Sequence, residues 1–455
     1  MIPAIDFLIQ LAADKGVSEV VMGMSHRGRL NTLANIFEKS TNEIFAEFEG
    51  KDYEEDIFDG DVKYHLGWTS ERISDKGNKI NLNLAPNPSH LESVFPIVQG
   101  ISRAKIENDL DNDPNSLIPI IVHGDAAIAA QGVVYEVVQM SKLKGYSTGG
   151  TIHIIVNNQI GFTTNYLDGR SSTYCSDIGK VTLSPVLHVN SDDVEAVVHA
   201  ISFALDYRME YGMDIFIDLL GYRKYGHNEG DEPMFTNPLM YKHIKKQKTS
   251  LSIYTERLVN DGLIPEGEIE DMKASFQAKM NDEFEAGRDY KPNKADWLDG
   301  RWSHLDRHKD DYQRGKTAIS EETFFDIGKA LSQPPKDYEL HKTVARLLDT
   351  KGKMFDSGKG FDWATAEALA FGSLLTEGFP VRLSGQDSTR GTFSQRHSGL
   401  INQSTEERYY PLNNIRQGQA KYEVIDSMLT EYAVLGFEYG YSLAEPNALV
   451  LWEAQ

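Results

Sequence analysis

Apolar residues fall into short, dense runs over the first half of the chain, with helix-like segments between them. The runs cover residues 19–22, 117–122, 151–156 and 214–220. Gly23 follows the first run, and we expect it to end that strand. Apolar positions recur at helical spacing over 126–142 and over 194–209, and residues 191–193 offer capping oxygens before the second helix. Apolar strands alternating with helices predict a parallel sheet with helices on both faces.

The pattern weakens after residue 240. Residues 241–345 are polar and charged, with a helical piece at 269–280 and a charged stretch at 306–316, so we interpret them as a helical connector. A second α/β pattern then begins near Phe361. Its expected elements are a helix at 364–377, a strand at 381–383, a polar loop at 385–397 and a strand at 448–452.

We therefore predict an α/β protein with two doubly wound parallel-sheet domains joined by a helical connector. The expected segments are 1–240, 241–345 and 346–455. Met1 leads at once into an apolar helical segment, and the chain stops just after its last apolar run. We expect a fragment that lacks both ends, in which the second domain is truncated at the C-terminus.

The composition of the chain limits the kinds of partner that we expect it to bind. The 455 residues carry a formal net charge of −22, so a nucleic acid is a poor partner and an anionic membrane is not favoured. Cys175 is the single cysteine, which excludes an internal disulfide and a cysteine-built metal site and favours a reducing compartment. No apolar run approaches the ~18 residues of a membrane span, and we expect a soluble protein.

Polar residues follow two of the predicted strands at the point where each ends. Gly124-Asp125 comes after one strand and Asn157-Asn158 after the next. Because the carboxyl ends of parallel strands meet at one crevice, Asp125, the amide of Asn158 and the carbonyl of Ile160 could give oxygen ligands to one Mg²⁺. Gly124 would let a diphosphate approach the backbone, and a helix starting at Ala126 would offer free N–H groups. Alternatively, Asp125 is a helix cap and Asn157-Asn158 a turn, as is usual for either half alone.

The two halves together resemble the thiamine-diphosphate-binding motif, Gly-Asp-Gly followed further along by Asn-Asn. Ala126 departs from the second glycine, and this alanine is usual in the first, decarboxylating components of 2-oxoglutarate dehydrogenase complexes. Further segments are similar to that family. They are residues 25–31, 60–67, 87–92, 161–164, 225–229 and 437–441. The resemblance implies the thiamine-diphosphate-binding fold, in which 1–240 would bind diphosphate and magnesium and 346–455 the pyrimidine ring.

The resemblance also implies roles for single residues. The matching cofactor-binding positions are Arg27, His65, Leu91, Asp125, Ala126, Ala127, Asn158 and Glu438. The implied metal ligands are Asp125, Asn158 and Ile160. The matching substrate-binding positions are Arg27, His65, Ser89 and His90, and the implied catalytic residues are Glu438, His65 and His90. Glu438 would hydrogen-bond the pyrimidine nitrogen and promote the reactive tautomer of the cofactor; without the resemblance it would be taken for a surface carboxylate.

For the other candidate residues, an ordinary structural role is an alternative to a role in the site. His26 is a further substrate candidate and His227 a proton-handling one, although most histidines are surface or structural. Leu91 would pack on the pyrimidine, but an apolar residue there is more often core. The loop residues Gln386, Asp387, Arg390 and His397 would meet the partner's cofactor or form a solvated loop.

The implied activity is oxidative decarboxylation of 2-oxoglutarate in the tricarboxylic acid cycle, with transfer of the succinyl group to a lipoyl group. The implied partners are the dihydrolipoyl succinyltransferase and dihydrolipoyl dehydrogenase components. In the family the two halves of a site come from different subunits, so a homodimer is expected, in the bacterial cytoplasm or, in a eukaryote, the mitochondrial matrix. The alternatives are 2-oxoadipate or pyruvate as substrate, joining to an aldehyde, a transketolase, and an inactive scaffold subunit.

Overall fold

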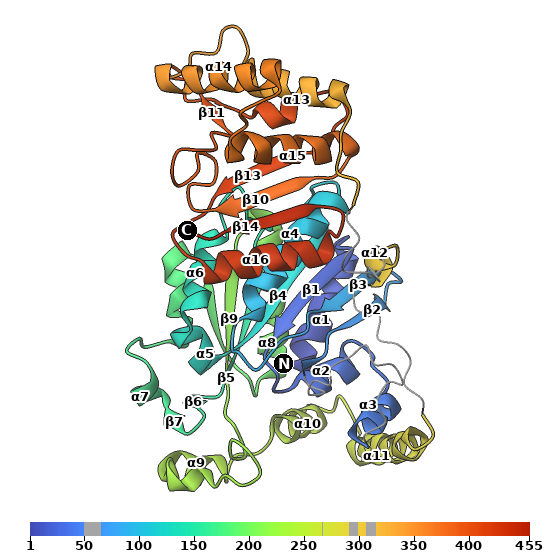
Figure 1. Cartoon of the computed structure of the whole chain (residues 1–455). Helices are drawn as coiled ribbons and strands as arrows, with labels where there is room; N and C mark the ends of the chain where they lie inside the picture. Colours follow the sequence, from blue (N-terminus) through green and yellow to red (C-terminus); the bar gives the residue numbers. More distant parts are fainter. Residues whose placement is uncertain (50–64, 266, 291–298, 306–314) are drawn as a thin grey trace. The chain divides into compact units, whose positions relative to one another are not determined.

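The computed structural model describes residues 1–49, 65–265, 267–290, 299–305 and 315–455. The expected segment 60–67 therefore lies outside the described residues up to Tyr64, as does most of the charged stretch 306–316. Contacts divide the chain into two compact units, Met1–Asp299 and Gly300–Gln455 (Figure 1). The expected connector 241–345 is shared between them, because its first helices belong to the first unit and the others to the second.

The first unit is built on a seven-stranded sheet, which confirms the predicted α/β fold with a large parallel sheet. The strand order is β2-β3-β1-β4-β5-β9-β8, and all neighbours are parallel except β2 and β3. The strands are β1 (Glu19–Met24), β2 (Trp68–Ile73), β3 (Lys79–Leu84), β4 (Leu117–Gly124), β5 (Ile152–Asn157), β8 (Val186–Asn190) and β9 (Ile215–Leu220). The apolar runs predicted four of these strands. The sequence interpretation missed β2, β3 and β8, which are short, partly polar strands towards the sheet edges.

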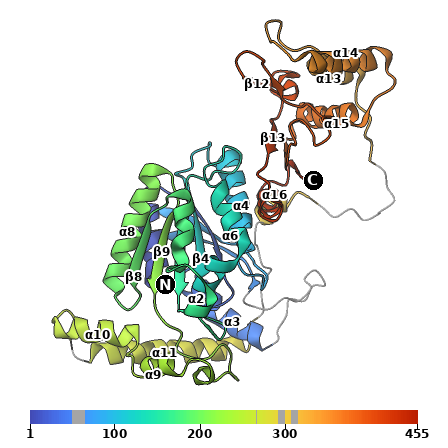
Figure 2. The ribbon, with the colours of Figure 1, turned by 90° about the vertical axis from the view of Figure 1, so that its left-hand side faces the viewer.

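Helices cover both faces of this sheet (Figure 2). Alternate apolar residues of the strands pack on α1 (Ile2–Asp14) and α8 (Val194–Tyr211) in one continuous core, and α4 (Val94–Asn108) and α6 (Gly132–Met140) cover the other face. The expected start of α8 is confirmed, since the Asp193 carboxylate accepts a hydrogen bond from the N–H of Ala196.

Two predictions about element ends are wrong. β1 continues through Gly23 to Met24, because Gly23 faces α4 and a Cβ there would lie only 2.9 Å from Cγ2 of Val98. The glycine marks a close helix–strand approach rather than the end of the strand. The single helix expected at 126–142 is two helices, α5 (Asp125–Ala130) and α6, since Gln131 adopts an extended conformation with φ −77° and ψ 116°.

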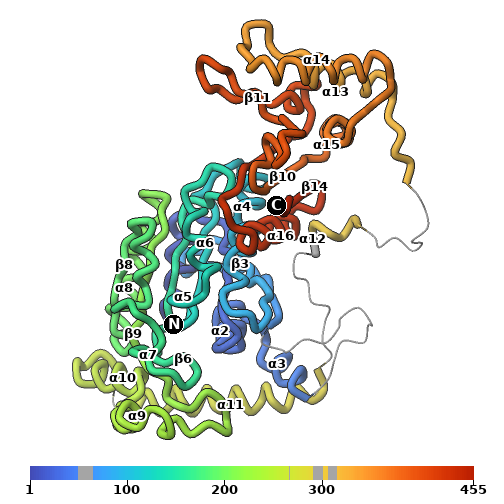
Figure 3. Tube along the Cα trace, turned by 60° about the vertical axis from the view of Figure 1, so that its left-hand side comes forward, coloured from blue at the N-terminus to red at the C-terminus, as the bar shows by residue number. Residues whose placement is uncertain are grey.

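The rest of the first unit consists of further helices and one small hairpin. The remaining helices are α2 (Arg29–Asn35), α3 (Thr41–Phe48), α7 (Tyr166–Gly169), α9 (Pro238–Ile244), α10 (Ser250–Asn260) and α11 (Glu268–Gly287), with 3₁₀ helices at Cys175–Thr182 and Pro233–Phe235. β6 (Ile160–Gly161) and β7 (Thr164–Asn165) form a small hairpin after β5. Figure 3 traces the chain from β9 into α9, α10 and α11, and α11 packs against α3.

The second unit holds a three-stranded parallel sheet of order β13-β10-β14. Its strands are β10 (Val381–Gly385), β13 (Tyr422–Asp426) and β14 (Leu449–Glu453), with a β11–β12 hairpin (Leu400–Ile401, Arg408–Tyr409). Its helices are α13 (Glu321–Ser332), α14 (Lys342–Ser357), α15 (Trp363–Glu377) and α16 (Tyr432–Ala444), with a 3₁₀ turn at Pro411–Asn414, and α12 (Asp299–Trp302) spans the unit boundary. The helix and strands expected from residue 364 onward are confirmed. No helix among the described residues is both long and apolar enough to cross a membrane.

Candidate active site

The structure brings Asp125 and Asn158 together at the carboxyl edge of the large sheet. β4 and β5 are parallel neighbours, with Gly124 opposite Val156, so the residues that follow each strand share one edge. The carboxylate of Asp125 accepts a hydrogen bond from the backbone N–H of Asn158. Asn157 serves a different purpose, because its side-chain amide is buried and donates to Oδ1 of Asp218 at 2.9 Å. The backbone of the second asparagine therefore reaches Asp125, while Oδ1 of its side chain accepts a hydrogen bond from the N–H of Ile160 at 3.2 Å.

Burial makes Asp125 harder to ionise than an ordinary aspartate. The side chain is almost completely buried, and this burial raises the pKa of its carboxyl to about 6, while the Arg170 guanidinium opposes the shift. That opposition is limited, since Nη1 of Arg170 lies 3.7 Å from Oδ2 of Asp125. A buried carboxylate with so little compensating charge suits a bound cation.

The proposed metal ligands of this site are not a cluster of acidic side chains. No cluster of three or more His, Cys, Asp or Glu side chains suited to a metal occurs in the part of the chain that the structure describes. A magnesium site with one carboxylate, one amide oxygen and one backbone carbonyl has a different composition, and hard cations accept such ligands together with phosphate and water. Asp125, Asn158 and the buried Ile160 fit that donor set.

The helix that starts at Asp125 differs from the expected one. It has only six residues, and the Asp125 carboxylate itself takes the N–H groups of Asp125 and Ala126. The free N–H groups expected at Ala126 are thus already engaged. Ala126 is exposed and Ala127 is buried, so only the first of these two predicted cofactor contacts presents its side chain at the surface.

A second cluster forms around His65. Nε2 of His65 lies 3.1 Å from the Ser89 hydroxyl, and its ring meets the His26 ring edge to face at 6.1 Å between centroids. Burial lowers the pKa of His26, and the charges of Arg27 and His65 act in the same direction. Three segments that sequence reasoning had picked out separately therefore meet here. The next two residues on the Ser89 segment, His90 and Leu91, are exposed.

Arg27 and His227 form a third cluster although 200 positions separate them. Nη2 of Arg27 lies 3.0 Å from Nε2 of His227, and the ring of Phe162 packs on the histidine at 3.8 Å between centroids. Burial lowers the pKa of His227, and the Arg27 charge lowers it further, which favours a neutral imidazole that accepts the arginine's hydrogen bond. The neighbouring Arg223 donates to the carbonyl of Phe162 at 2.8 Å. The sequence interpretation included Phe162 only as part of the family-like segment 161–164, and it missed Arg223.

The two arginines of the His-Arg-Gly-Arg segment have different tasks. Arg27 is exposed, whereas Arg29 is fully buried and donates hydrogen bonds to the carbonyls of Met24, Leu66 and Ala85. Arg29 thereby ties the ends of β1 and β3 to the chain before β2. Its role is structural, and it holds the segment that carries Arg27.

A buried polar chain lies behind the site. Oε2 of Glu92 contacts Nδ1 of His123 at 2.6 Å, and Nε2 of His123 contacts Nδ1 of His153 at 2.9 Å. Oδ2 of Asp214 lies 3.7 Å beyond, from Nε2 of His153. Glu92 follows Leu91, and His123 precedes Gly124-Asp125, so the pair links two predicted site segments. Their only sequence signal is a polar residue inside or beside an apolar run.

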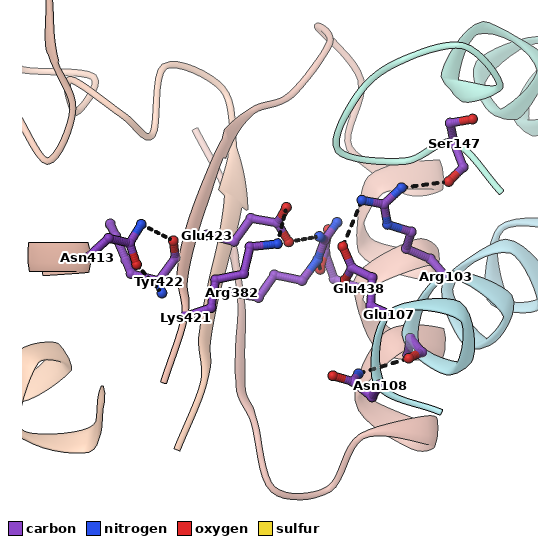
Figure 4. A network of polar contacts seen from close by, with 11 residues as sticks. Arg103, Glu107, Asn108, Ser147, Arg382, Asn413, Lys421, Tyr422, Glu423 and Glu438 are labelled. Carbon is purple, nitrogen blue, oxygen red and sulfur yellow. Dashed lines mark hydrogen bonds and ion pairs between the residues drawn. The ribbon is translucent and has the colours of Figure 1, made fainter. Parts of the chain in front are cut away.

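Glu438 lies in the second unit and is not a surface carboxylate. It sits in the middle of α16, is 2% exposed, and contacts Arg382 of β10 with both carboxylate oxygens (Figure 4). Burial raises the pKa of Glu438, and the Arg382 charge opposes this. The sequence interpretation missed Arg382, although a charged residue inside the apolar strand Val381–Leu383 is a recognisable signal.

The predicted loop of Gln386, Asp387, Arg390 and His397 borders a cavity of about 360 Å³ within the second unit. Asp387, Arg390 and His397 line it, together with Arg408 and Asp426. Oδ2 of Asp387 lies 3.5 Å from Nη2 of Arg390, and burial lowers the pKa of His397. The loop is folded against its own unit rather than fully solvated.

Comparisons with known proteins agree with this arrangement. Residues 1–296 match the family described as dehydrogenase E1 component, and residues 359–455 match the transketolase pyrimidine-binding domain. The "2-oxoglutarate dehydrogenase E1 component" of Brucella canis is 53% identical over 100% of this chain and 46% of its own length. The protein of the same name from Brucella anthropi is 52% identical over 100% of this chain and 47% of its own length. The chain spans about half the length of the curated relatives it matches.

Proposed function

Since the chain belongs to the dehydrogenase E1 component family, we propose that it carries the cofactor-binding part of an enzyme that oxidatively decarboxylates 2-oxoglutarate. The proposed cofactors are thiamine diphosphate and Mg²⁺. The match of residues 359–455 to a pyrimidine-binding domain supports the first of these. The observation that carries the proposal is the buried, undercompensated Asp125 bonded to Asn158 at the carboxyl edge of the sheet.

Each unit has its own task in this proposal. Asp125, Asn158 and the carbonyl of Ile160 would hold Mg²⁺ and, through it, the diphosphate. The pyrimidine would meet Glu438, and Leu91 would pack on it. When bound, thiamine diphosphate supplies the carbon nucleophile and the electron sink for loss of carbon dioxide. The chain's own side chains then have to bind the substrate, orient the cofactor and move protons.

The substrate proposal rests on the clusters around His65 and Arg27. A 2-oxo dicarboxylate needs a cation and neutral donors, and Arg27, held by His227, supplies the fixed positive charge. The Ser89–His65 pair can donate a hydrogen bond and exchange a proton, because the imidazole can be donor or acceptor. His90, on the same segment and exposed, is the proposed second proton-handling residue.

The proposed assembly follows from the proposed activity. The succinyl group would pass to the lipoyl group of a dihydrolipoyl succinyltransferase, and a dihydrolipoyl dehydrogenase would reoxidise that group. We propose a homodimer, in which Asp125 of one subunit and Glu438 of the other complete one site. A cytoplasmic location is proposed because the relatives named above are bacterial.

A comparison of substrates on the full-length protein tests this function. With ferricyanide as electron acceptor and thiamine diphosphate and Mg²⁺ present, 2-oxoglutarate should be oxidised far faster than pyruvate. 2-Oxoadipate, one methylene longer, is the control for chain length, and a rate near that of 2-oxoglutarate would widen the proposal to both dicarboxylates. Equal rates with 2-oxoglutarate and pyruvate would overturn the dicarboxylate assignment.

A further inference from the structure

The interior of the second unit contains three charged side chains on one face of its sheet (Figure 4). Arg382 on β10 lies directly opposite Glu423 on β13 in the strand register, and Nη1 of Arg382 contacts Oε2 of Glu423 at 2.6 Å. Val381 and Leu383 point the other way, into the apolar core. The alternation of β10 therefore directs its arginine away from the apolar core.

Arg382 binds Glu438 with fixed, two-point geometry. Nε of Arg382 donates to Oε2 of Glu438 at 2.7 Å, and Nη2 donates to Oε1 at 2.9 Å. The rings of Phe437 and Tyr441, on the same helix as Glu438, lie 5.4 and 4.6 Å from the guanidinium carbon. Arg382 and Glu438 are each only 2% exposed. The carboxylate has no freedom to turn while this fork is in place.

A buried ion pair of this kind needs a reason beyond stability. Taking both charges out of water costs about as much as their attraction returns, and apolar side chains of similar volume often serve the fold equally well. The groups that face Glu438 are Arg382 and Ser384 from β10 and Glu423 from β13. Tyr441, on the same helix as Glu438, faces Arg382, and Lys421 lies beyond Glu423. Arg382 is the one cation in contact with the Glu438 carboxylate among these groups.

We propose that Arg382 is a positioning residue, which keeps Glu438 ionised and oriented for the ring nitrogen of a bound pyrimidine. This inference rests on the proposed function. The two arginine bonds and the hydrogen bond from the Ser384 hydroxyl use three of the roughly four acceptor sites of the carboxylate and leave one for a ring nitrogen. An ionised acceptor binds a protonated ring nitrogen through a charge-assisted bond, which is stronger than a bond between neutral groups. Arg382 thus favours leaving the shared proton on the cofactor rather than on Glu438.

The test is a double-mutant cycle on thiamine diphosphate affinity in the full-length protein, measured by calorimetry at saturating Mg²⁺ over mildly acidic to mildly alkaline pH. Arg382→Met should weaken binding about tenfold near neutral pH, a change of about 1.4 kcal/mol. The loss should shrink as pH rises, because the carboxyl of Glu438 regains its charge. Arg382→Lys keeps the positive charge, so it should bind the cofactor more tightly than Arg382→Met does. Its affinity should not change with pH. In a Glu438→Gln background neither change at Arg382 should weaken binding further.

Control variants and melting measurements separate a positioning role of Arg382 from a role in folding. Arg346→Met removes an exposed arginine of the same unit and should leave affinity unchanged. Thermal melting reports whether each variant folds, and if Arg382→Met does not, the cycle is completed with Arg382→Lys. The inference is overturned if the losses of affinity add in the double variants. It is also overturned if the Arg382 variants that fold bind the cofactor with normal affinity. If the unmodified protein does not bind the cofactor at all, the proposed function fails instead.

Discussion

The Cβ of Ala126 lies 2.7 Å from the position that a Cβ on Gly161 would occupy. The two residues belong to α5 and β6, the elements that carry Asp125 and Ile160. The loops after β4 and β5 are therefore in direct contact, and the spacing of the candidate metal ligands depends on a missing side chain at Gly161. The alanine at 126, where the general cofactor motif has glycine, makes this contact tighter.

This contact predicts a rescue experiment. Gly161→Ala should push the two loops apart and weaken binding of Mg²⁺ and thiamine diphosphate about tenfold, since carboxylate and carbonyl would no longer share one ion. Adding Ala126→Gly should restore most of the affinity, because it removes the opposing methyl group. Gly132→Ala, where nothing lies within 4 Å of the new Cβ, is the matched control and should bind normally. Calorimetry measures all of these variants, and a double variant as weak as Gly161→Ala would contradict the contact argument.

Asp125 should destabilise the metal-free protein. Its folded-state pKa is raised to about 6, so the folded protein holds this proton more tightly than the unfolded chain does, and stability falls as pH rises towards 6. Asp125→Asn removes the buried charge and should raise the free energy of unfolding at neutral pH by about 3 kcal/mol. That advantage should shrink by about 1 kcal/mol on going to pH ~5.

Urea unfolding at the two pH values, with a chelator present, measures this effect. Asp282→Asn, an exposed carboxylate on α11, is the control and should change little at either pH. An unchanged or lowered stability of Asp125→Asn at neutral pH would mean that the carboxylate is fully compensated without a metal.

The Glu92–His123 pair should matter to the fold as well as to the site. Glu92→Ala leaves His123, which is 1% exposed, without its carboxylate, and removing one partner of a buried pair typically costs about 3 kcal/mol. The matched control is Glu71→Ala, whose exposed bridge to Lys79 should contribute less than about 1 kcal/mol. Chemical denaturation measures the free energy of unfolding of both variants. Equal losses would show that the buried Glu92–His123 pair stabilises the fold no more than the exposed ion pair does.

In the proposed function, recognition of the substrate's charge depends on Arg27. Arg27→Gln keeps the side chain polar but removes its charge, and should raise the KM for 2-oxoglutarate at least about tenfold with a smaller change in kcat. Loss of the Arg27 charge should also raise the pKa of His227, because that charge lowers it in the unmodified protein. Arg257→Gln, on the surface helix α10, serves as control in steady-state kinetics. A fall in kcat with unchanged KM would assign Arg27 to the chemical step instead.

The sequence was most informative where a pattern is local. The long apolar runs that became β4, β5 and β9, and the capped start of α8 at Asp193, follow from periodicity and capping chemistry alone. The Asp125–Asn158 contact was also predictable, because adjacent parallel strands bring their carboxyl ends together. Gly23 was misinterpreted since a glycine that ends a strand and one that admits a helix look the same in sequence.

The partners of the site residues could not be predicted. Arg27 and His227 are 200 positions apart, and nothing local in either segment specifies the other. The same holds for Arg382 and Glu438, which come from a strand and a helix 56 positions apart. Such contacts depend on how the elements pack, whereas the sequence shows only that a charged residue stands where an apolar one is expected.

In the proposed function, Asp125 is the carboxylate of a magnesium–diphosphate clamp. Titration calorimetry of thiamine diphosphate into the full-length protein tests it most directly, with and without Mg²⁺, for the unmodified protein, Asp125→Ala and the control Asp282→Ala. We expect tight binding that requires Mg²⁺ in the unmodified protein and the control, and no measurable binding by Asp125→Ala. Tight binding by Asp125→Ala, or equal binding without Mg²⁺, would contradict it.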